Sequence, residues 1–133
     1  MDLQAYVKEH FPEIKAGLRP FGEHVIVQLK ITREKTKSGI VLAQTTRDVN
    51  DENTQIARVV ALGPLAFRNR TTQELWPEGI WANVGELVLV PKWGGFRFAK
   101  TTPEGDRVVF CMFKDRELWG GVDENFDGLE EVI

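Results

Sequence analysis

A chain of 133 residues with 42% apolar content is long enough to fold as one globular domain with its own core. The formal net charge of -3 argues against a nucleic-acid module, which normally presents a basic face. The single cysteine, Cys111, excludes an internal disulfide, and its apolar neighbours predict a buried thiol in a reducing compartment. The sequence has neither an apolar stretch of membrane-spanning length nor a signal-type start, so we expect a cytoplasmic protein.

The first predicted element is a short helix over about residues 2–10. Asp2 is a suitable N-cap, and Pro12 ends the helix or bends the chain. Apolar residues recur at helical spacing between them, namely Leu3, Tyr6 and Val7. We therefore expect residues 1–17 to form an N-terminal helical extension ahead of the main fold.

From Leu18 onward the pattern favours β structure. Val25, Val27 and Leu29 alternate with other residues, which is typical of a strand with one face on a core. The predicted strands span 25–31, 56–62, 87–90, 96–99 and 108–113, with a further short strand at 129–133. The segment 93–96 could stack a ligand on its aromatic residues, but we expect a tight turn whose flanking aromatic residues lie in the core. Short strands punctuated by Gly and Pro predict an all-β fold, either a small antiparallel barrel or a sandwich.

Two long connections and an acidic tail interrupt or follow these strands. The connections span about 32–54 and 64–83, and loops of this length are usually functional. Aromatic residues in the second connection predict a hairpin or cover with its own apolar contacts; they are Phe67, Trp76 and Trp81. No Lys or Arg follows Arg116, so residues 123–133 are expected to form an acidic tail.

The strongest functional signal lies in the first connection. Residues 35–38 are polar, one glycine follows, and Ile40, Val41 and Leu42 then stand together before a further polar run to residue 53. Two interpretations stay open on this local pattern. The apolar triplet either anchors the chain in a hydrophobic groove on another protein, or forms a short strand in the core of its own subunit.

The sequence offers no catalytic site. Neither a phosphate-binding loop nor a dinucleotide fingerprint is present. His10 and His24 have no second ligand at metal spacing, and one cysteine cannot build a zinc cluster. We therefore predict a binding protein rather than an enzyme, with no cofactor and no metal.

The order of the segments resembles the GroES co-chaperonin family. Residues 18–27 are similar to the family's opening strand and 36–42 to its mobile loop with a G-I-V-L anchor. Residues 57–63, 84–89 and 108–122 are similar to its later strands. Each match is a common β pattern, but five in the right order are specific. Ala57 stands where the family has a glycine, and Glu86 where it has an aspartate. These departures and the additions at both ends resemble a divergent bacteriophage-encoded member.

The resemblance implies an all-β, GroES-like antiparallel barrel over residues 18–122. It also implies a mobile loop at about 32–54 and a roof-type hairpin insertion at about 64–83. Such a protein forms a heptameric ring that caps a GroEL-type chaperonin in its ATP- or ADP-bound state. The ring encloses a client for folding, and a phage capsid protein is a candidate client. The expected compartment is the cytoplasm, or the host cytoplasm for a phage-encoded member, without nucleic acid or membrane.

The resemblance assigns three sets of residues. Chaperonin binding falls to Gly39, Ile40, Val41 and Leu42. The interface between neighbouring subunits places Leu18, Arg19 and Pro20 against Leu118, Trp119 and Val122, with Trp119 packing inside its own subunit as the alternative. Roof residues are Phe67, Trp76 and Trp81. The competing function is a non-catalytic virion structural or decoration protein built on the same barrel.

Overall fold

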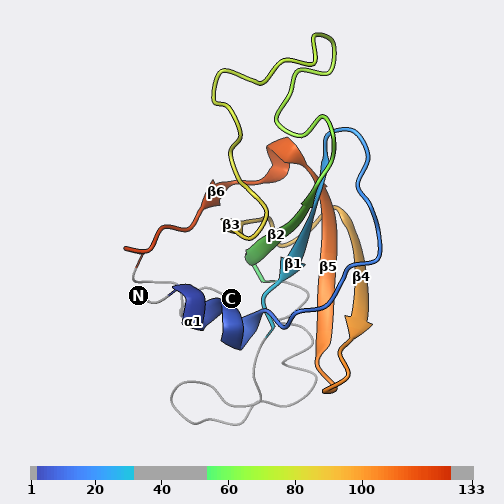
Figure 1. Cartoon of the computed structure of the whole chain (residues 1–133), viewed down its shortest axis with the longest axis vertical. Coiled ribbons are helices and arrows are strands. Elements are labelled where there is room, and N and C mark those ends of the chain that lie inside the picture. The colour runs from blue at the N-terminus through green and yellow to red at the C-terminus, as the bar shows by residue number, and fades with distance from the viewer. Residues whose placement is uncertain (1–2, 32–53, 127–133) are drawn as a thin grey trace.

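The computed structural model describes residues 3–31 and 54–126 (Figure 1). The predicted helix is confirmed as α1, Leu3–His10. The strands are β1 (His24–Leu29), β2 (Ile56–Leu62), β3 (Leu87–Leu89), β4 (Phe96–Thr101), β5 (Arg107–Lys114) and β6 (Gly120–Gly121), with a 3-10 turn, η1, at Asp115–Glu117. The all-β class is confirmed, while the strand expected at 129–133 lies outside the described residues.

The strands form one antiparallel six-stranded sheet in the order β4-β5-β1-β2-β3-β6. β1 lies between β2 and β5 and pairs with both. Opposite β2, Ile26 pairs with Ala61 but Val27 pairs with Val59, so the register shifts by one residue, as in a β-bulge. The predicted hairpin is confirmed by the β4–β5 ladder. The sheet therefore has β4 at one edge and β6 at the other.

The central strand β1 is buried on both faces, which corrects the expectation of one buried face. Val25, Val27 and Leu29 lie in the main core. On the other face Ile26 is fully buried, and Gln28 is 1% exposed. The Gln28 side-chain amide donates a hydrogen bond to the carbonyl oxygen of Pro12 at 2.8 Å. The stretch that follows α1 thus covers a face that the alternation in the sequence assigned to solvent.

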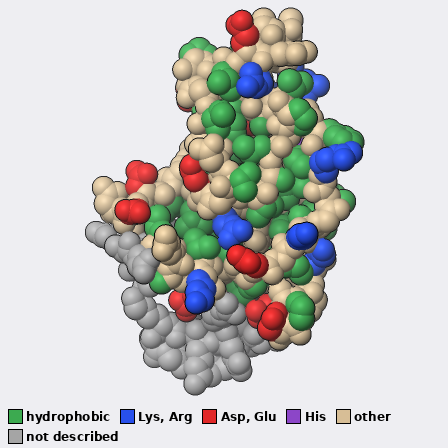
Figure 2. Space-filling model, viewed as in Figure 1, with side chains coloured by type: hydrophobic (Ala, Val, Ile, Leu, Met, Phe, Trp, Pro, Cys, Tyr) green, Lys and Arg blue, Asp and Glu red, His purple; other side chains and the backbone are tan. Residues whose placement is uncertain are grey.

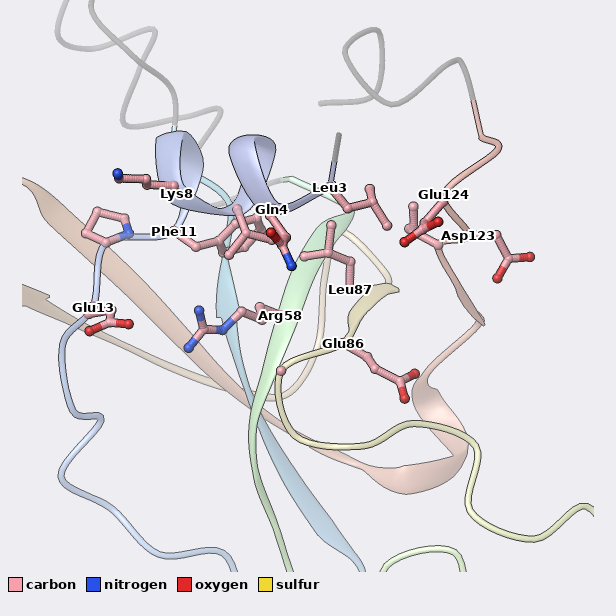
Figure 3. Close-up of a pocket in the computed structure, with 14 residues that line it drawn as sticks. Leu3, Gln4, Lys8, Phe11, Glu13, Arg58, Glu86, Leu87, Asp123 and Glu124 are labelled. Atoms are coloured by element: carbon pink, nitrogen blue, oxygen red, sulfur yellow. The ribbon is translucent and has the colours of Figure 1, made fainter. Parts of the chain in front are cut away.

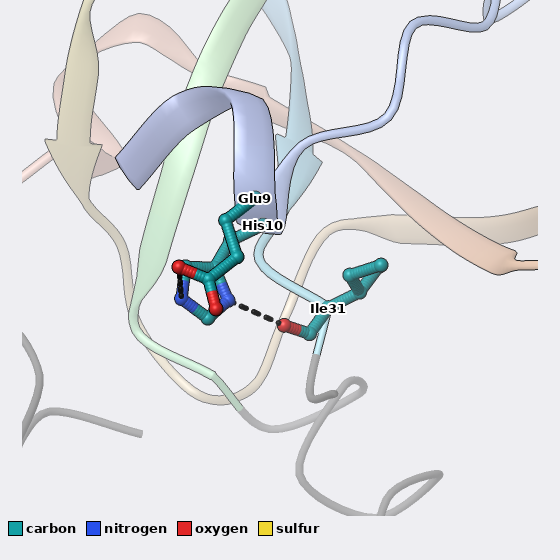
Figure 4. Close-up of polar contacts among 3 residues, drawn as sticks. All are labelled: Glu9, His10 and Ile31. Atoms are coloured by element: carbon teal, nitrogen blue, oxygen red, sulfur yellow. Dashed lines mark hydrogen bonds and ion pairs between the residues drawn. The ribbon is translucent and has the colours of Figure 1, made fainter. Parts of the chain in front are cut away.

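Helix α1 packs onto the sheet rather than standing apart from it. Tyr6 and Phe11 are buried in a cluster with Ile56 and Leu87. The Ile31 N–H donates to the carbonyl oxygen of His10 at 3.0 Å, and His10 Nδ1 lies 3.2 Å from the Ile31 carbonyl oxygen (Figure 4). Glu9 Oε2 lies 3.8 Å from His10 Nε2. The end of α1 is therefore fastened to the chain just beyond β1.

The turn at 93–96 forms as predicted, but its aromatic residues are not in the core. Gly94 and Gly95 both have positive φ, at 93° and 71°, as a tight turn requires. Trp93 is 77% exposed and Phe96 is 58% exposed. Phe96 stacks on Phe98, with ring centroids 5.7 Å apart, and Phe98 stacks in turn on the buried Phe110. The expectation of core packing was wrong because the strand β4 borders solvent.

Candidate functional site

The chaperonin-binding residues expected from sequence, Gly39, Ile40, Val41 and Leu42, lie outside the described residues. The structure does describe the two ends of the segment that carries them. Lys30 N–H donates to the Ile56 carbonyl oxygen at 3.0 Å, and the buried Thr54 hydroxyl accepts from Ile56 N–H at 3.2 Å. Both ends are therefore held side by side by the β1–β2 pairing.

The first expected interface segment, residues 18–20, presents apolar and basic groups to solvent. Leu18 is 47% exposed, Arg19 is exposed, and Pro20 is buried. The sequence prediction missed Phe21, which is 69% exposed and carries the Arg19 guanidinium 5.4 Å from its ring centroid. We call Leu18, Arg19 and Phe21 the basic-aromatic hook. Its only sequence signal was an aromatic residue directly after the proline.

The second expected interface segment forms an edge of the sheet. β6 pairs with β3 on one side only, through residues next to Trp119 and Val122. Trp119 N–H donates to Leu89 O at 2.9 Å, yet its side chain is 62% exposed. The alternative in which Trp119 packs inside its own subunit is therefore wrong for this chain taken alone. Leu118 packs against the main core, and Val122 against the α1 cluster.

The two expected interface segments lie on opposite sides of the molecule. In Figure 1 the chain between α1 and β1 runs along the side of the sheet away from β6, which is red-orange. Leu18, Arg19 and Pro20 therefore do not meet Leu118, Trp119 and Val122 within one chain. A contact between these two sets requires two copies arranged head to tail.

The expected roof residues do not form one group. Phe67 is buried, and its ring centroid lies 5.0 Å from that of the half-buried Trp81. Trp76 is 40% exposed and belongs instead with Leu75 and Ile80, which are 42% and 50% exposed. The connection 64–83 projects from one end of the sheet and contains an isolated bridge between Arg68 and Leu75 (Figures 1 and 2). Its exposed apolar side chains, Leu75, Trp76 and Ile80, lie between a polar tip at 69–74 and a root packed into the core.

A buried carboxylate fixes the root of this insertion. Phe67 has φ of 63°, an uncommon conformation for a bulky residue. Its N–H donates to Asp115 Oδ2 at 2.7 Å, and Arg116 N–H donates to Asp115 Oδ1, also at 2.7 Å. Asp115 is 3% exposed. Nothing in the local sequence distinguished this aspartate from its charged neighbours.

We expect Asp115→Ala to lower the free energy of unfolding by about 2 kcal/mol, because it leaves the buried Phe67 N–H without an acceptor. Asp115→Asn keeps one acceptor oxygen and should lose less. Urea unfolding followed by tryptophan fluorescence measures both changes. Glu104→Ala, in the exposed β4–β5 turn, is the control and should stay within about 0.5 kcal/mol of the parent. Equal stability of Asp115→Ala and Glu104→Ala would contradict a structural role for this carboxylate.

The predicted burial of Cys111 is confirmed, and burial raises the pKa of its thiol from 9.0 to about 11. At pH 8 its thiolate fraction is thus about 100-fold lower than that of an ordinary cysteine. We expect the folded protein to react with a disulfide reagent at least that much more slowly than the unfolded chain. The same shift lowers stability as the pH rises from 9 towards 11. Rapid labelling of the native protein at pH 8 would contradict this burial.

Among residues 3–31 and 54–126, no group of three or more His, Cys, Asp or Glu side chains could hold a metal ion. The described part also has no helix long and apolar enough to cross a membrane.

Comparison with known proteins identifies the family. Residues 17–120 match the model of the family described as "Chaperonin 10 Kd subunit". The chain belongs to this family. The match covers the hook, the segment 39–42, the insertion 64–83 and Trp119, whereas α1 and the residues after β6 lie outside it.

Individual relatives of the Chaperonin 10 family agree with this assignment. A protein of Clostridium beijerinckii named "Co-chaperonin GroES" is 40% identical over 81 residues, which cover 59% of this chain and 74% of the relative. A Tetragenococcus halophilus protein of the same name is 37% identical over 78 residues. A third, from Halalkalibacterium halodurans, is 30% identical over 116 residues, or 87% of each chain. The resemblance found in the sequence is therefore confirmed at the level of the family.

Proposed function

We propose that this chain is a co-chaperonin that forms a ring and caps a GroEL-type chaperonin. The observation that carries the proposal is the family match over residues 17–120, since it includes both the segment 39–42 and most of the expected subunit interface. The relatives named "Co-chaperonin GroES" support the same role. The function is binding, and the ATP chemistry belongs to the chaperonin.

Chaperonin binding is assigned to Gly39, Ile40, Val41 and Leu42. Each of the three apolar side chains contributes about 1.5–3 kcal/mol when it leaves water for an apolar groove. Ordering the flanking backbone costs about 1–2 kcal/mol per residue and offsets much of that gain. One segment therefore binds weakly, and several segments on one ring bind tightly together. Such attachment suits a lid that leaves when the nucleotide state of its partner changes.

Ring formation is assigned to Leu18, Arg19 and Pro20 of one subunit and Leu118, Trp119 and Val122 of the next. Three observations support this pairing. The two segments lie on opposite sides of the subunit, β6 is an edge strand, and Trp119 is 62% exposed. An exposed edge strand beside a large aromatic side chain is a ready surface for a neighbouring chain. By family resemblance the ring is heptameric.

The roof of the ring is assigned to the insertion 64–83. Trp76, Leu75 and Ile80 form its exposed apolar part, while Phe67 and Trp81 hold its root. The enclosed space receives a client protein in the cytoplasm.

Refolding of a chaperonin-dependent client tests this proposal. The assay compares chaperonin and ATP alone, with this protein added, and with an established GroES added. We expect this protein to raise the yield of active client to the level that the GroES gives. A yield no higher than with chaperonin and ATP alone would favour the virion structural role instead.

A further inference from the structure

A pocket of about 840 Å³ lies between α1, β2, the start of β3 and the chain after β6 (Figure 3). Apolar side chains from α1, the residue after it, β3 and the chain after β6 line it, among them Leu3, Phe11, Leu87 and Val122, while β2 contributes Arg58. In Figure 3 the Arg58 side chain extends from β2 beneath α1, and the carboxylates of Asp123 and Glu124 lie beyond Leu3. The pocket is therefore an apolar hollow with Arg58 beneath α1 and carboxylates at its margin.

Negative charge prevails among the residues that line this pocket. The cations are Lys8 and Arg58, against four carboxylates, Glu13, Glu86, Asp123 and Glu124. The excess of carboxylates favours an occupant that carries an apolar side chain together with a positive charge.

This pocket draws on residues at both ends of the chain, outside the family match. The family match begins at residue 17, after the end of α1, Leu3–His10. It stops at residue 120, before the lining residues Val122, Asp123 and Glu124. The two additions outside the match thus meet on one side of the sheet and enclose a space that neither makes alone.

The basic-aromatic hook has the chemistry that the pocket selects. Leu18 and Phe21 are 47% and 69% exposed, and the Arg19 guanidinium lies 5.4 Å from the Phe21 ring centroid, so the cation and the aromatic ring form one projecting group. The buried Pro20 fixes the backbone between them. One segment therefore offers apolar surface and a positive charge together.

We propose that the pocket of one subunit receives the basic-aromatic hook of the adjacent subunit. The hook runs along the side of the sheet away from β6, so one chain does not fill its own pocket (Figure 1). Val122 belongs both to the pocket and to the proposed ring interface, which makes the two surfaces continuous. The inference rests on the proposed ring and adds α1 to its interface. Helix α1 then contacts the hook of the adjacent subunit and stabilises the ring.

Cysteine cross-linking tests the contact directly. Gln4 lines the pocket and is exposed, so the variant Phe21→Cys, Gln4→Cys places one thiol on the hook and one in the pocket. Oxidation should give a ladder of covalent multimers that ends at the ring size. The matched control pairs Phe21→Cys with Glu104→Cys, in the exposed β4–β5 turn, and should give no ladder. The buried Cys111 does not need to be replaced.

The outcomes separate this inference from the ring proposal. An assembled ring without a ladder overturns the hook contact and leaves the ring. A parent protein that stays monomeric overturns both.

A charge reversal covers the case in which Phe21→Cys itself weakens assembly. Arg19→Glu should raise the concentration at which the ring dissociates about tenfold, because it places a carboxylate against four others. Lys15→Glu makes the same charge change on the same stretch outside the hook and should leave that concentration unchanged. Equal behaviour of the two variants overturns the contact.

Discussion

Replacing Ile40 and Leu42 together with serine is expected to abolish nucleotide-dependent capture of this protein by a GroEL-type chaperonin. Each replacement removes apolar surface worth about 1.5–3 kcal/mol on burial. A loss of about 3 kcal/mol per segment weakens each contact at least 100-fold, and the loss recurs in every subunit of the ring. A pull-down with immobilised, ADP-loaded chaperonin measures the effect.

The matched control for this variant is Gln44→Ser, Thr46→Ser. It makes two replacements by serine in the same segment but spares the apolar triplet. Both variants should keep the ring mass of the parent, so that a change in capture reports on the chaperonin contact alone. Retained capture of the Ile40→Ser, Leu42→Ser ring would show that another surface makes this contact.

The second large effect, a loss of stability, is expected at Gly63. This residue directly follows β2 and lies against the start of β1. A Cβ atom at this position would lie 2.4 Å from the carbonyl oxygen of Gly22 and 2.8 Å from that of His24. Both oxygens already accept backbone hydrogen bonds, from Leu65 and from Gly63 itself. Because backbone cannot swing aside as a side chain does, Gly63→Ala should lower the free energy of unfolding by about 3 kcal/mol.

Thermal unfolding measures this loss, and the midpoint should fall by roughly 10 °C. Gly79→Ala is the control, because a Cβ atom there meets nothing within 4 Å. Its φ of 72° alone should cost about 1 kcal/mol. A midpoint for Gly63→Ala no lower than that of Gly79→Ala would contradict the close approach of Gly63 to the backbone of Gly22 and His24.

Most strands could be predicted because their signals are local. β2 ends at Leu62, directly before Gly63 and Pro64, and the β4–β5 hairpin has Pro, Gly and Asp in its connection, so composition alone marks the boundaries. The local pattern did not predict β6, because two glycines carry no apolar pattern, and only the family resemblance over 108–122 covers it. It forms through pairing with Val88 and Leu89, far away in the sequence.

The burial of individual side chains was less predictable, since it depends on what covers each face. Gln28 is buried only because the chain near Pro12 crosses β1 and accepts its hydrogen bond. Trp93 and Phe96 stay exposed because nothing in the described chain covers β4 at that point. Local hydrophobicity gives the same prediction for an aromatic residue in either setting.

The binding and interface segments of the candidate site stay predictions. The segment 39–42 and the two interface segments follow from a family pattern that is written in the sequence. The α1 pocket was not predictable, because it joins residues near both ends of the chain through contacts on β2 and β3. The hydrogen bond from Phe67 N–H to Asp115 was not predictable either, because it joins residues 48 positions apart in the sequence.

The most direct test of the co-chaperonin proposal is the mass of the complex that this protein forms with a GroEL-type chaperonin, measured by native mass spectrometry with and without ADP. We predict a complex that contains one ring of this protein on a chaperonin end, present with nucleotide and absent without it. A chaperonin that stays uncapped in ADP, under conditions where an established GroES binds, would contradict the proposal.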